Sequence, residues 1–295
     1  MRKVFPLLLL LLSFSLHAEE HQLNHNGLII NANLEAASDN WKNGTVVLMT
    51  HGTLAHNRME IMATLQEMFK DRGISSLAIN LSLGLSKRTG MYDCAVPHTH
   101  KHTDALDEIG LWLGWLKQQG VKSVVLLGHS RGGNQTAWFA AERDDAAITK
   151  VVLVAPQVWS EEKNSKGYQK SYNKPLAPVL AKAKKLVDAG KGDTMLKPVD
   201  FIYCPQSSAS ASAFVAYYQP DMRMNTPSLL KQISKPVLVF AGSEDTVVKG
   251  LEEKMATPSE RNNISFEVID GADHFFLDLY AEELADMAEE FITGE

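Results

Sequence analysis

One serine of this chain has neighbours that would suit a nucleophile. Residues 128–132 read Gly-His-Ser-Arg-Gly and directly follow the apolar run at 124–127. Glycines on both sides remove the Cβ clashes of a very tight turn from a strand into a helix, and such a turn holds the hydroxyl up at the sheet edge. The backbone amide of the next residue, Arg131, then points at the negative charge that develops on a substrate. The spacing therefore predicts that Ser130 is a nucleophile.

A serine hydroxyl needs a base to accept its proton and an acid to orient that base. His274 is the only histidine after this turn, and it ends the sequence Gly-Ala-Asp-His just behind the apolar segment at 264–269. Asp245 follows another apolar segment and ends the sequence Gly-Ser-Glu-Asp. We expect His274 to be the base and Asp245 the acid. Glu244 is the alternative acid, because the spacing does not show which of the two carboxylates turns inward.

A second donor to the developing charge is expected from the loop after an early strand. The apolar run at 45–50 leads into His51, Gly52 and Thr53, and the glycine lets the backbone turn sharply there. The amide of Thr53 is predicted to join that of Arg131 in an oxyanion hole. His51 stands one residue after a buried strand, which favours a structural hydrogen bond over a role as a second base.

The segments that must position these residues alternate between apolar strands and amphipathic helices. Continuous apolar runs, typical of strands buried on both faces of a parallel sheet, occur at 45–50, 76–80, 124–127, 151–154, 236–240 and 264–269. Apolar residues recur at helical spacing at 61–69, 106–116, 135–142 and 284–291. This alternation predicts an α/β fold with a mostly parallel central sheet and helices on both faces.

The alternation breaks between residues 157 and 227. This stretch contains one expected helix at 176–189 and no clear buried strand. A break of about seventy residues is too long for an ordinary connection, so we expect a largely helical lid inserted into a core formed by 19–156 and 228–295. Ligands of open α/β sheets bind beyond the carboxyl ends of the strands. A lid that leaves from that edge would cover the site.

These motifs and their order resemble the α/β-hydrolase superfamily, particularly its lidded serine carboxylesterases and lipases. The resemblance covers roughly residues 44–292, apart from the insertion. It implies the α/β-hydrolase fold, with Ser130, Asp245 and His274 as a catalytic triad. The dehalogenases of this superfamily use a carboxylate as nucleophile, whereas this chain has a serine at that position.

The reaction expected from this set is hydrolysis of a small-molecule carboxylic ester through an acyl-enzyme on Ser130, without a cofactor. The same triad would serve a peptidase, an amidase or a thioesterase, and the lid rather than the triad would decide between these substrates. A periplasmic binding protein that keeps the fold without turnover is the alternative from a different class.

The first residues predict export from the cytoplasm. Arg2 and Lys3 precede an apolar run at 4–16, and a small residue, Ala18, ends the segment. This pattern is typical of a secretory signal peptide at 1–18. The run is shorter than the roughly 20 apolar residues that span a bilayer. We therefore expect a periplasmic or secreted protein without stable membrane insertion after cleavage.

Export also bears on the two cysteines, Cys94 and Cys204. In an oxidising compartment they could form a disulfide that ties the lid to the core, whereas in a reducing compartment they would remain free thiols.

Composition and charge narrow the function further. The chain has 295 residues, a formal net charge of −6 and no basic cluster, so nucleic-acid binding is not expected.

His98, His100 and His102 alternate and would share one face of an extended segment, where they could bind Zn²⁺ or Cu²⁺. Loop histidines are more often hydrogen-bonded or solvated, and we predict no metal site.

Overall fold

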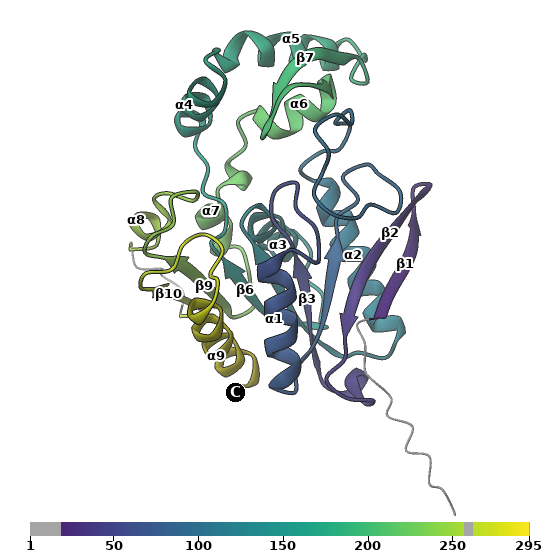
Figure 1. Cartoon of the computed structure of the whole chain (residues 1–295), viewed down its shortest axis with the longest axis vertical. Coiled ribbons are helices and arrows are strands. Elements are labelled where there is room, and N and C mark those ends of the chain that lie inside the picture. The colour runs from purple at the N-terminus through teal and green to yellow at the C-terminus, as the bar shows by residue number, and fades with distance from the viewer. Residues whose placement is uncertain (1–18, 257–261, 295) are drawn as a thin grey trace, which may run out of the picture.

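Eight strands form one sheet in the computed structural model, which describes residues 19–256 and 262–294. Their order across the sheet is β1-β2-β4-β3-β5-β6-β9-β10. All neighbours from β4 to β10 are parallel, whereas β1 and β2 extend the edge as an antiparallel hairpin (Figure 1). The predicted α/β fold with a mostly parallel sheet is confirmed. The signal peptide predicted at 1–18 lies outside the described residues.

The strands of this sheet are β1 (Glu19–His25), β2 (Leu28–Glu35), β3 (Thr45–Thr50), β4 (Ser75–Asn80), β5 (Ser123–His129), β6 (Ile148–Val154), β9 (Val237–Gly242) and β10 (Ile264–Ile269). The helices that connect them are α1 (Glu60–Asp71), α2 (Asp104–Gln118), α3 (Arg131–Glu142), α7 (Thr226–Leu230), α8 (Leu251–Met255) and α9 (Leu279–Thr293). A 3-10 turn, η1 (Trp41–Asn43), precedes β3. Over the described ranges, no helix combines the length and apolarity that crossing a bilayer requires.

Each face of the sheet has its own apolar layer. Successive side chains of a strand point to opposite faces, so a continuous apolar run supplies both layers at once. On one face, α1 and α9 pack together through residues such as Phe69 and Leu284. On the other face, α2 and α3 pack together through residues such as Trp112 and Phe139. The sheet is therefore covered on both sides, and its strand ends are left for the site.

Most of the residues between β6 and α7 form a separate layer above the sheet (Figure 1). They make α4 (Glu161–Tyr172), α5 (Leu176–Asp188), the hairpin β7 (Met195–Phe201) and β8 (Cys204–Ser210), α6 (Ala211–Tyr218) and a 3-10 turn, η2 (Met222–Met224). We call residues 157–227 the insertion. It has its own buried cluster, in which Phe201 and Phe214 are fully enclosed.

The insertion also contains two strands that the sequence pattern did not indicate, because β7 and β8 pair as an antiparallel hairpin beside the helices. Proline argues against a strand, and Pro198 lies inside β7. In β8 the buried positions are occupied by Cys204, Ser207, Ala209 and Ser210, which are too small and polar to give an apolar period. The hairpin is stabilised by tertiary packing, which the local pattern did not show.

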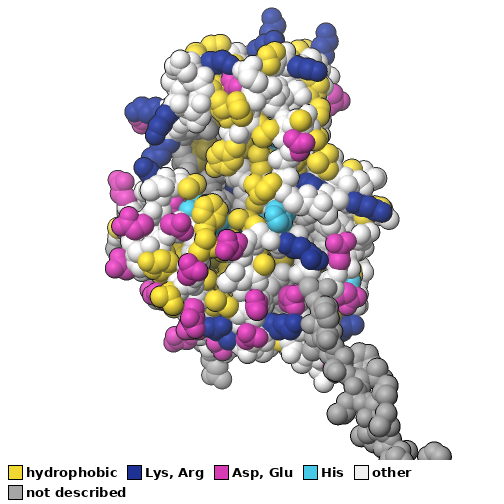
Figure 2. All heavy atoms as spheres, viewed as in Figure 1, with side chains coloured by type: hydrophobic (Ala, Val, Ile, Leu, Met, Phe, Trp, Pro, Cys, Tyr) yellow, Lys and Arg dark blue, Asp and Glu magenta, His cyan; other side chains and the backbone are white. Residues whose placement is uncertain are grey.

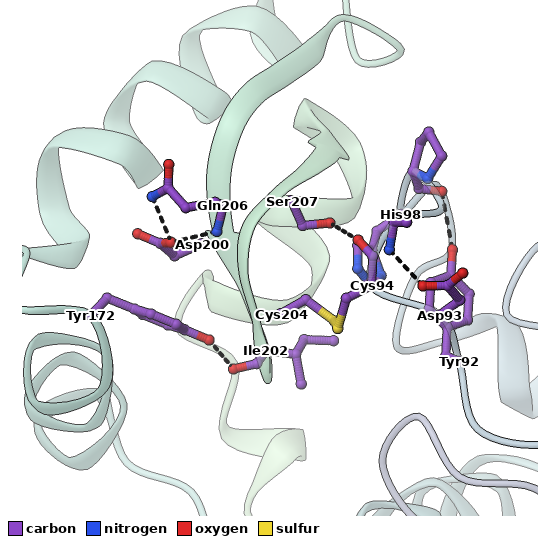
Figure 3. Close-up of a disulfide and its surroundings, with 12 residues drawn as sticks. Tyr92, Asp93, Cys94, His98, Tyr172, Asp200, Ile202, Cys204, Gln206 and Ser207 are labelled. Atoms are coloured by element: carbon purple, nitrogen blue, oxygen red, sulfur yellow. Dashed lines mark hydrogen bonds between the residues drawn. A yellow bond between two sulfur atoms is a disulfide. The ribbon is translucent and has the colours of Figure 1, made fainter.

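The hairpin is joined to a core loop by a covalent bond and by backbone hydrogen bonds. Cys94 and Cys204 form a disulfide with a Cα–Cα distance of 5.2 Å (Figure 3). The Ser207 hydroxyl donates to the Cys94 carbonyl oxygen at 2.8 Å (Figure 3). The backbone of His98 pairs with β8 in a parallel bridge, through bonds to Ser208 and Ser210 of 2.8 and 2.9 Å. Of the two states left open for the cysteines, the structure shows the disulfide.

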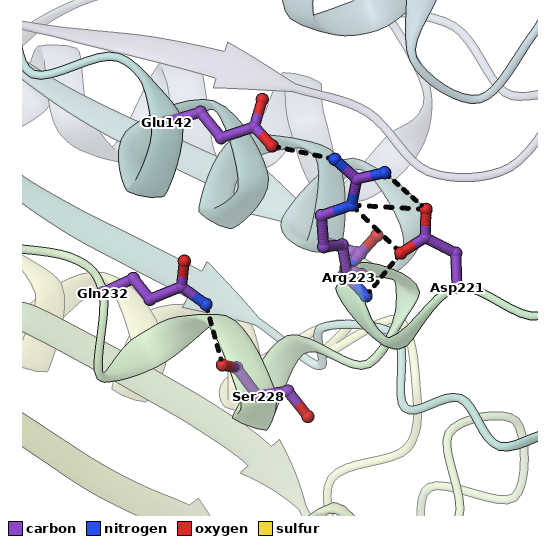
Figure 4. Close-up of polar contacts among 6 residues, drawn as sticks. Glu142, Asp221, Arg223, Ser228 and Gln232 are labelled. Carbon is purple, nitrogen blue, oxygen red and sulfur yellow. Dashed lines mark hydrogen bonds and ion pairs between the residues drawn. The ribbon is translucent and has the colours of Figure 1, made fainter.

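A second attachment lies where the insertion returns to the core. Arg223 of η2 pairs with Asp221 at 2.8 Å and with Glu142 of α3 at 3.2 Å (Figure 4). Its guanidinium also lies 4.5 Å from the ring centroid of Trp138. Asn134 of α3 donates to the Arg223 carbonyl oxygen at 2.9 Å. These contacts fix the end of the insertion against the helix that follows Ser130.

Breaking the disulfide should lower stability, because the bond closes a loop with a sequence separation of 110. We expect reduction to decrease the free energy of unfolding by roughly 2–4 kcal/mol. Urea denaturation with and without a reductant would measure the change. The Cys94→Ser/Cys204→Ser double variant should have the urea midpoint of the reduced wild type, and that midpoint should be the same with and without the reductant. Equal midpoints for oxidised and reduced wild type would contradict this prediction.

Candidate active site

Ser130 occupies a strained turn between β5 and α3. Its φ of 57° and ψ of −121° lie outside the conformations that residues with a Cβ normally adopt. The two glycines allow close packing around it. A Cβ at Gly132 would lie 2.2 Å from the His51 carbonyl oxygen, and one at Gly128 would lie 2.5 Å from the Gly132 carbonyl oxygen. No side chain fits at either place, so the turn requires both glycines.

The structure brings the three predicted triad residues into one hydrogen-bonded series. His274 Nε2 lies 3.0 Å from Ser130 Oγ, and His274 Nδ1 lies 2.8 Å from Asp245 Oδ2. The side chains of His274 and Asp245 are only 6% and 5% exposed, so their contact is shielded from water. The imidazole can accept the serine proton at one nitrogen while the carboxylate holds the other N–H.

Asp245, and not its neighbour Glu244, faces the imidazole. Asp245 Oδ1 accepts from the amides of Val247 and Val248 at 2.7 and 2.9 Å, which fixes the carboxylate, while Glu244 is exposed. Burial alone would raise the pKa of Asp245, but the hydrogen bonds from His274 and from these amides outweigh it and lower the pKa. The carboxylate is therefore ionised at neutral pH.

The two predicted oxyanion donors lie on either side of Ser130. A Cβ at Gly52 would lie 3.2 Å from Ser130 Cβ, so the loop that carries Thr53 packs directly on the serine. The Arg131 amide is at the first turn of α3, where helix N–H groups have no partner within the helix. Neither amide has an acceptor among the described residues. Both are free to bind an oxygen of a substrate.

His51 supports this loop and does not contact the triad. Its Nε2 accepts from the Leu81 amide at 3.1 Å, so Nδ1 carries the proton and donates to the Gly52 carbonyl oxygen at 2.9 Å. Arg88 lies against the same nitrogen and also donates to Asn80. Burial and the nearby Arg88 lower the pKa of His51 well below its usual value. The sequence did not point to Arg88, because a lone arginine in a loop has no motif.

His129 holds the loop of the base in place. It donates through Nε2 to the His274 carbonyl oxygen at 2.9 Å. Burial and the neighbouring His274 lower its pKa to about 4, so the ring is neutral. In the sequence, His129 stands out only as part of the Gly-His-Ser-Arg-Gly turn, and only the fold brings it to its partner 145 positions away.

His98, His100 and His102 are all buried, but only His98 and His100 are hydrogen-bonded to each other, whereas His102 bonds to Arg131 and Asn134. His98 Nδ1 and His100 Nε2 are 3.2 Å apart, and His100 Nδ1 is 2.8 Å from the Tyr217 hydroxyl. His102 accepts from Arg131 at 3.3 Å and donates to Asn134 at 2.9 Å. Among the residues that the structure describes, no group of three side chains is arranged to hold a metal ion. Five of the six ring nitrogens bond to one another or to neighbouring side chains, and His98 Nε2 is buried without a hydrogen-bond partner among the described residues.

A cavity of about 490 Å³ lies between the core and the insertion, and residues next in sequence to Ser130 and Asp245 line it, while the triad itself does not. Arg131 lines it from the core, Thr246 and Val247 line it from the loop that carries Asp245, and Gln157 lines it from the start of the insertion. Helices α4 and α6 form its other wall. Figure 2 shows hydrophobic side chains gathered along this junction between insertion and core. A volume of this size is typical of small-molecule sites.

Comparison with known proteins places the chain in a family. The sequence model of the family described as serine aminopeptidase, S33, matches residues 42–278. The chain belongs to this family. It is a serine hydrolase with the α/β-hydrolase fold of esterases and lipases, as the resemblance implied.

A bifunctional esterase/perhydrolase of Acinetobacter calcoaceticus is 29% identical over 148 residues, which are 44% of this chain and 52% of that protein. The match thus spans about half the length of that relative.

Solved structures share the fold at lower identity. Est1E from Butyrivibrio proteoclasticus has a TM-score of 0.62 at 18% identity, over 92% of this chain and 97% of its own. The α/β hydrolase GrgF from Penicillium has a TM-score of 0.68 at 16% identity, over 94% and 98%. A monoacylglycerol lipase of Paleococcus ferrophilus has a TM-score of 0.59 at 18% identity, over 89% and 98%.

Gly132→Ala should destabilise the protein, because the added Cβ would collide with the backbone of the loop after β3. We expect a loss of about 2–4 kcal/mol in the free energy of unfolding. Gly167→Ala in α4 is the matched control, since a Cβ there meets nothing within 4 Å. That variant should be neutral or slightly stabilising, as alanine favours helix. Similar urea midpoints for the two variants would argue against the predicted clash.

Stability should fall in mild acid because several histidines are buried and neutral. Burial, with nearby Arg131 at His102, lowers the pKa of His98 to about 4 and those of His100 and His102 to about 3. In the unfolded chain these rings bind protons near pH 6.5, so unfolding takes up protons below that pH. The stabilisation present above pH 6.5 is therefore lost progressively as the pH falls toward 4.

Replacing one of these histidines measures how much it contributes to the loss of unfolding free energy in acid. His98→Phe removes one titrating group and retains a ring beside Tyr92 and Phe201. Between pH 6 and 5 the unfolding free energy of this variant should fall by about 1 kcal/mol less than that of the wild type. Urea midpoints across this range measure the difference. The same pH slope in both proteins would contradict the assignment for His98.

Proposed function

We propose that this protein hydrolyses carboxylic esters of small molecules through a covalent acyl-enzyme on Ser130. The observation that supports this most directly is the series from Ser130 through His274 to Asp245, with contacts of 3.0 and 2.8 Å. It combines a nucleophile, a base within hydrogen-bonding reach and an acid that orients the base. Membership of a serine hydrolase family and the esterase names of related proteins support the same reaction.

The reaction follows from the positions of these groups. Ser130 Oγ attacks the ester carbonyl carbon while His274 Nε2 takes the hydroxyl proton, and Asp245 stabilises the imidazolium that forms. The amides of Thr53 and Arg131 bind the oxyanion, and each such donor contributes about 3–4 kcal/mol to lowering the barrier. His274 returns the proton to the departing alcohol. A water molecule, activated by the same ring, then releases the acid from Ser130.

Esters suit the neighbouring cavity better than peptides with a free amino terminus, the substrates that the family description suggests. An aminopeptidase has to bind an ammonium group, which needs carboxylates or other acceptors nearby. Among the described residues, the cavity beside Ser130 is lined by Arg131, Lys163, Lys170 and Lys249 and by no Asp or Glu. These four cations would repel an ammonium group.

Loss of the nucleophile should abolish turnover. We expect Ser130→Ala to reduce kcat/KM for 4-nitrophenyl butyrate by about 10⁴-fold or more, and Asp245→Asn to cost about 10⁴-fold in kcat. Ser165→Ala, on the exposed face of α4, is the control and should retain full activity. A fluorophosphonate probe should label the wild type and the control but not Ser130→Ala. Normal turnover by Ser130→Ala would refute the mechanism.

The same assays separate the alternatives. A panel with matched butyryl ester, amide and thioester substrates should show the ester turned over fastest. A binding protein that kept the fold without turnover would hydrolyse none of them and would not react with the probe. Labelling without turnover of the butyryl panel would show an activated serine whose preferred acyl group is not butyryl.

We further propose that the protein is exported to the periplasm or secreted after removal of residues 1–18. The basic, apolar and small residues of that segment support this, and a disulfide is typical of oxidising compartments. Fractionation of expressing cells, followed by mass spectrometry of the mature chain, tests the proposal. We expect a chain that starts near Glu19 outside the cytoplasm. Full-length protein confined to the cytoplasm would overturn it.

A further inference from the structure

The cavity between core and insertion has an unusual set of charges. Four cationic side chains line it, Arg131 from the turn, Lys163 and Lys170 from α4, and Lys249 from the loop after Asp245. No Asp or Glu is among its described lining residues. None of the four cations forms an ion pair with a carboxylate of the described residues. Lys163 Nζ does donate to the Lys249 carbonyl oxygen at 3.2 Å. An anion entering the cavity would therefore meet cations that no carboxylate of the described residues neutralises.

Of these four cations, Arg131 is the one nearest to the nucleophile in the chain, because it directly follows Ser130. Its Nε donates to the Thr53 hydroxyl at 3.0 Å, and its Nη1 donates to His102 at 3.3 Å. Both partners are neutral, since the pKa of His102 is lowered to about 3 by burial and by Arg131 itself. The guanidinium also lies 5.2 Å from the ring centroid of Tyr217. It is thus fixed in direction by the protein, and no carboxylate of the described residues pairs with it. Such a group is suited to bind a carboxylate.

The insertion as a whole differs in charge from the rest of the chain. Residues 157–227 contain ten Lys and Arg against six Asp and Glu, whereas the whole chain contains 29 against 35. Figure 2 shows the Asp and Glu side chains of the visible face gathered mainly on the core below the insertion. A cationic wall on an otherwise acidic protein attracts anions toward the cavity and raises their local concentration.

The rest of the cavity wall is aromatic. Its rings are Trp159, Tyr168, Tyr172, Tyr203, Tyr217 and Tyr218. Four of the five tyrosine hydroxyls already bond to the protein. Tyr168 and Tyr172 donate to the carbonyl oxygens of Asp200 and Ile202, Tyr218 accepts from the Ile202 amide, and Tyr217 bonds to His100.

Because those hydroxyls are occupied, the tyrosines offer ring carbons to a ligand rather than polar groups. Aromatic rings pack on one another in stacked or edge-to-face arrangements. A planar aromatic group therefore fits this wall better than a sugar, which would require free donors and acceptors. The cations and the rings together describe one ligand, a ring that carries a negative charge.

We propose that this cavity selects esters in which an aromatic ring carries a carboxylate. The inference rests on the proposed function, since the ester bond would be cleaved by Ser130. The ring packs among the tyrosines, and the carboxylate binds Arg131 and the lysines of α4. The insertion thereby decides which esters reach the triad.

Three matched pairs of esters test this selection, with hydrolysis followed by proton release at constant pH. The monoethyl ester of benzene-1,4-dicarboxylic acid is paired with ethyl benzoate, 4-acetoxybenzoate with phenyl acetate, and monoethyl succinate with ethyl butyrate. We expect the carboxylate to raise kcat/KM about tenfold in at least one aromatic pair, and less than twofold in the aliphatic pair. The preference should weaken at high salt. No preference in either aromatic pair, or an equal preference in the aliphatic pair, would overturn the proposal.

Variants of α4 link the preference to the cavity. Lys163→Gln/Lys170→Gln should raise KM for the preferred carboxylate ester about tenfold while its kcat and the hydrolysis of the neutral partner stay unchanged. Lys166→Gln is the matched control, since Lys166 lies on the same helix, pairs with Glu162 and does not line the cavity. Equal effects of the double variant and the control, or a loss that extends to the neutral ester, would contradict the assignment.

The ring component is tested at the exposed Tyr203, whose replacement should not disturb the fold. Tyr203→Phe should retain the preference for the aromatic carboxylate ester, and Tyr203→Ser should weaken it about threefold. Failure of this proposal remains distinct from failure of the proposed function. Hydrolysis without a carboxylate preference refutes only the selection, whereas no Ser130-dependent hydrolysis of any ester refutes the esterase itself.

Discussion

At Ser130 the chain passes from β5 into α3 through a conformation that costs a residue with a Cβ about 1–3 kcal/mol. The surrounding contacts hold it there. The Ser130 amide donates to the Val154 carbonyl oxygen at 2.9 Å, and its own carbonyl oxygen accepts from the Gln157 amide at 3.0 Å. The strained turn is thus fixed by the end of β6 and by the first residue of the insertion. The base, the acid and both oxyanion donors are arranged around this one point.

The insertion is anchored to the core at separate places, which makes it a fixed wall of the cavity. The disulfide and the His98 backbone attach the β7–β8 hairpin to the loop before α2. The contacts of Arg223 attach the returning segment to α3. Since α3 starts at the residue after Ser130, both the nucleophile and the cavity wall depend on the position of this helix.

Charge is distributed so that the site differs from the rest of the protein. The chain is acidic overall, yet the cavity beside Ser130 is lined by cations alone among charged residues. Behind Arg131 lies a layer of buried histidines with lowered pKa values, which add hydrogen bonds without adding charge. The guanidinium of Arg131 is therefore oriented by neutral partners. Arg131 lines the cavity, where the proposed carboxylate would bind.

The sequence by itself determined the sheet, most of its helices and the order of the triad. These features depend on local patterns, namely apolar runs, helical periodicity and glycines beside a serine, and the parallel strands had to bring their carboxyl ends to one edge. Tertiary structure alone decided which carboxylate of Glu244 and Asp245 turns inward, because the choice depends on two amides that fix Asp245.

Packing also decided the structure of the insertion. The β7–β8 hairpin contains a proline and small polar residues, and it is stabilised by contacts with distant residues. The same holds for the cationic and aromatic cavity, whose lining residues lie between positions 131 and 249. Their side chains form one wall only after the chain has folded, since no local sequence pattern predicts which distant residues will line the same cavity.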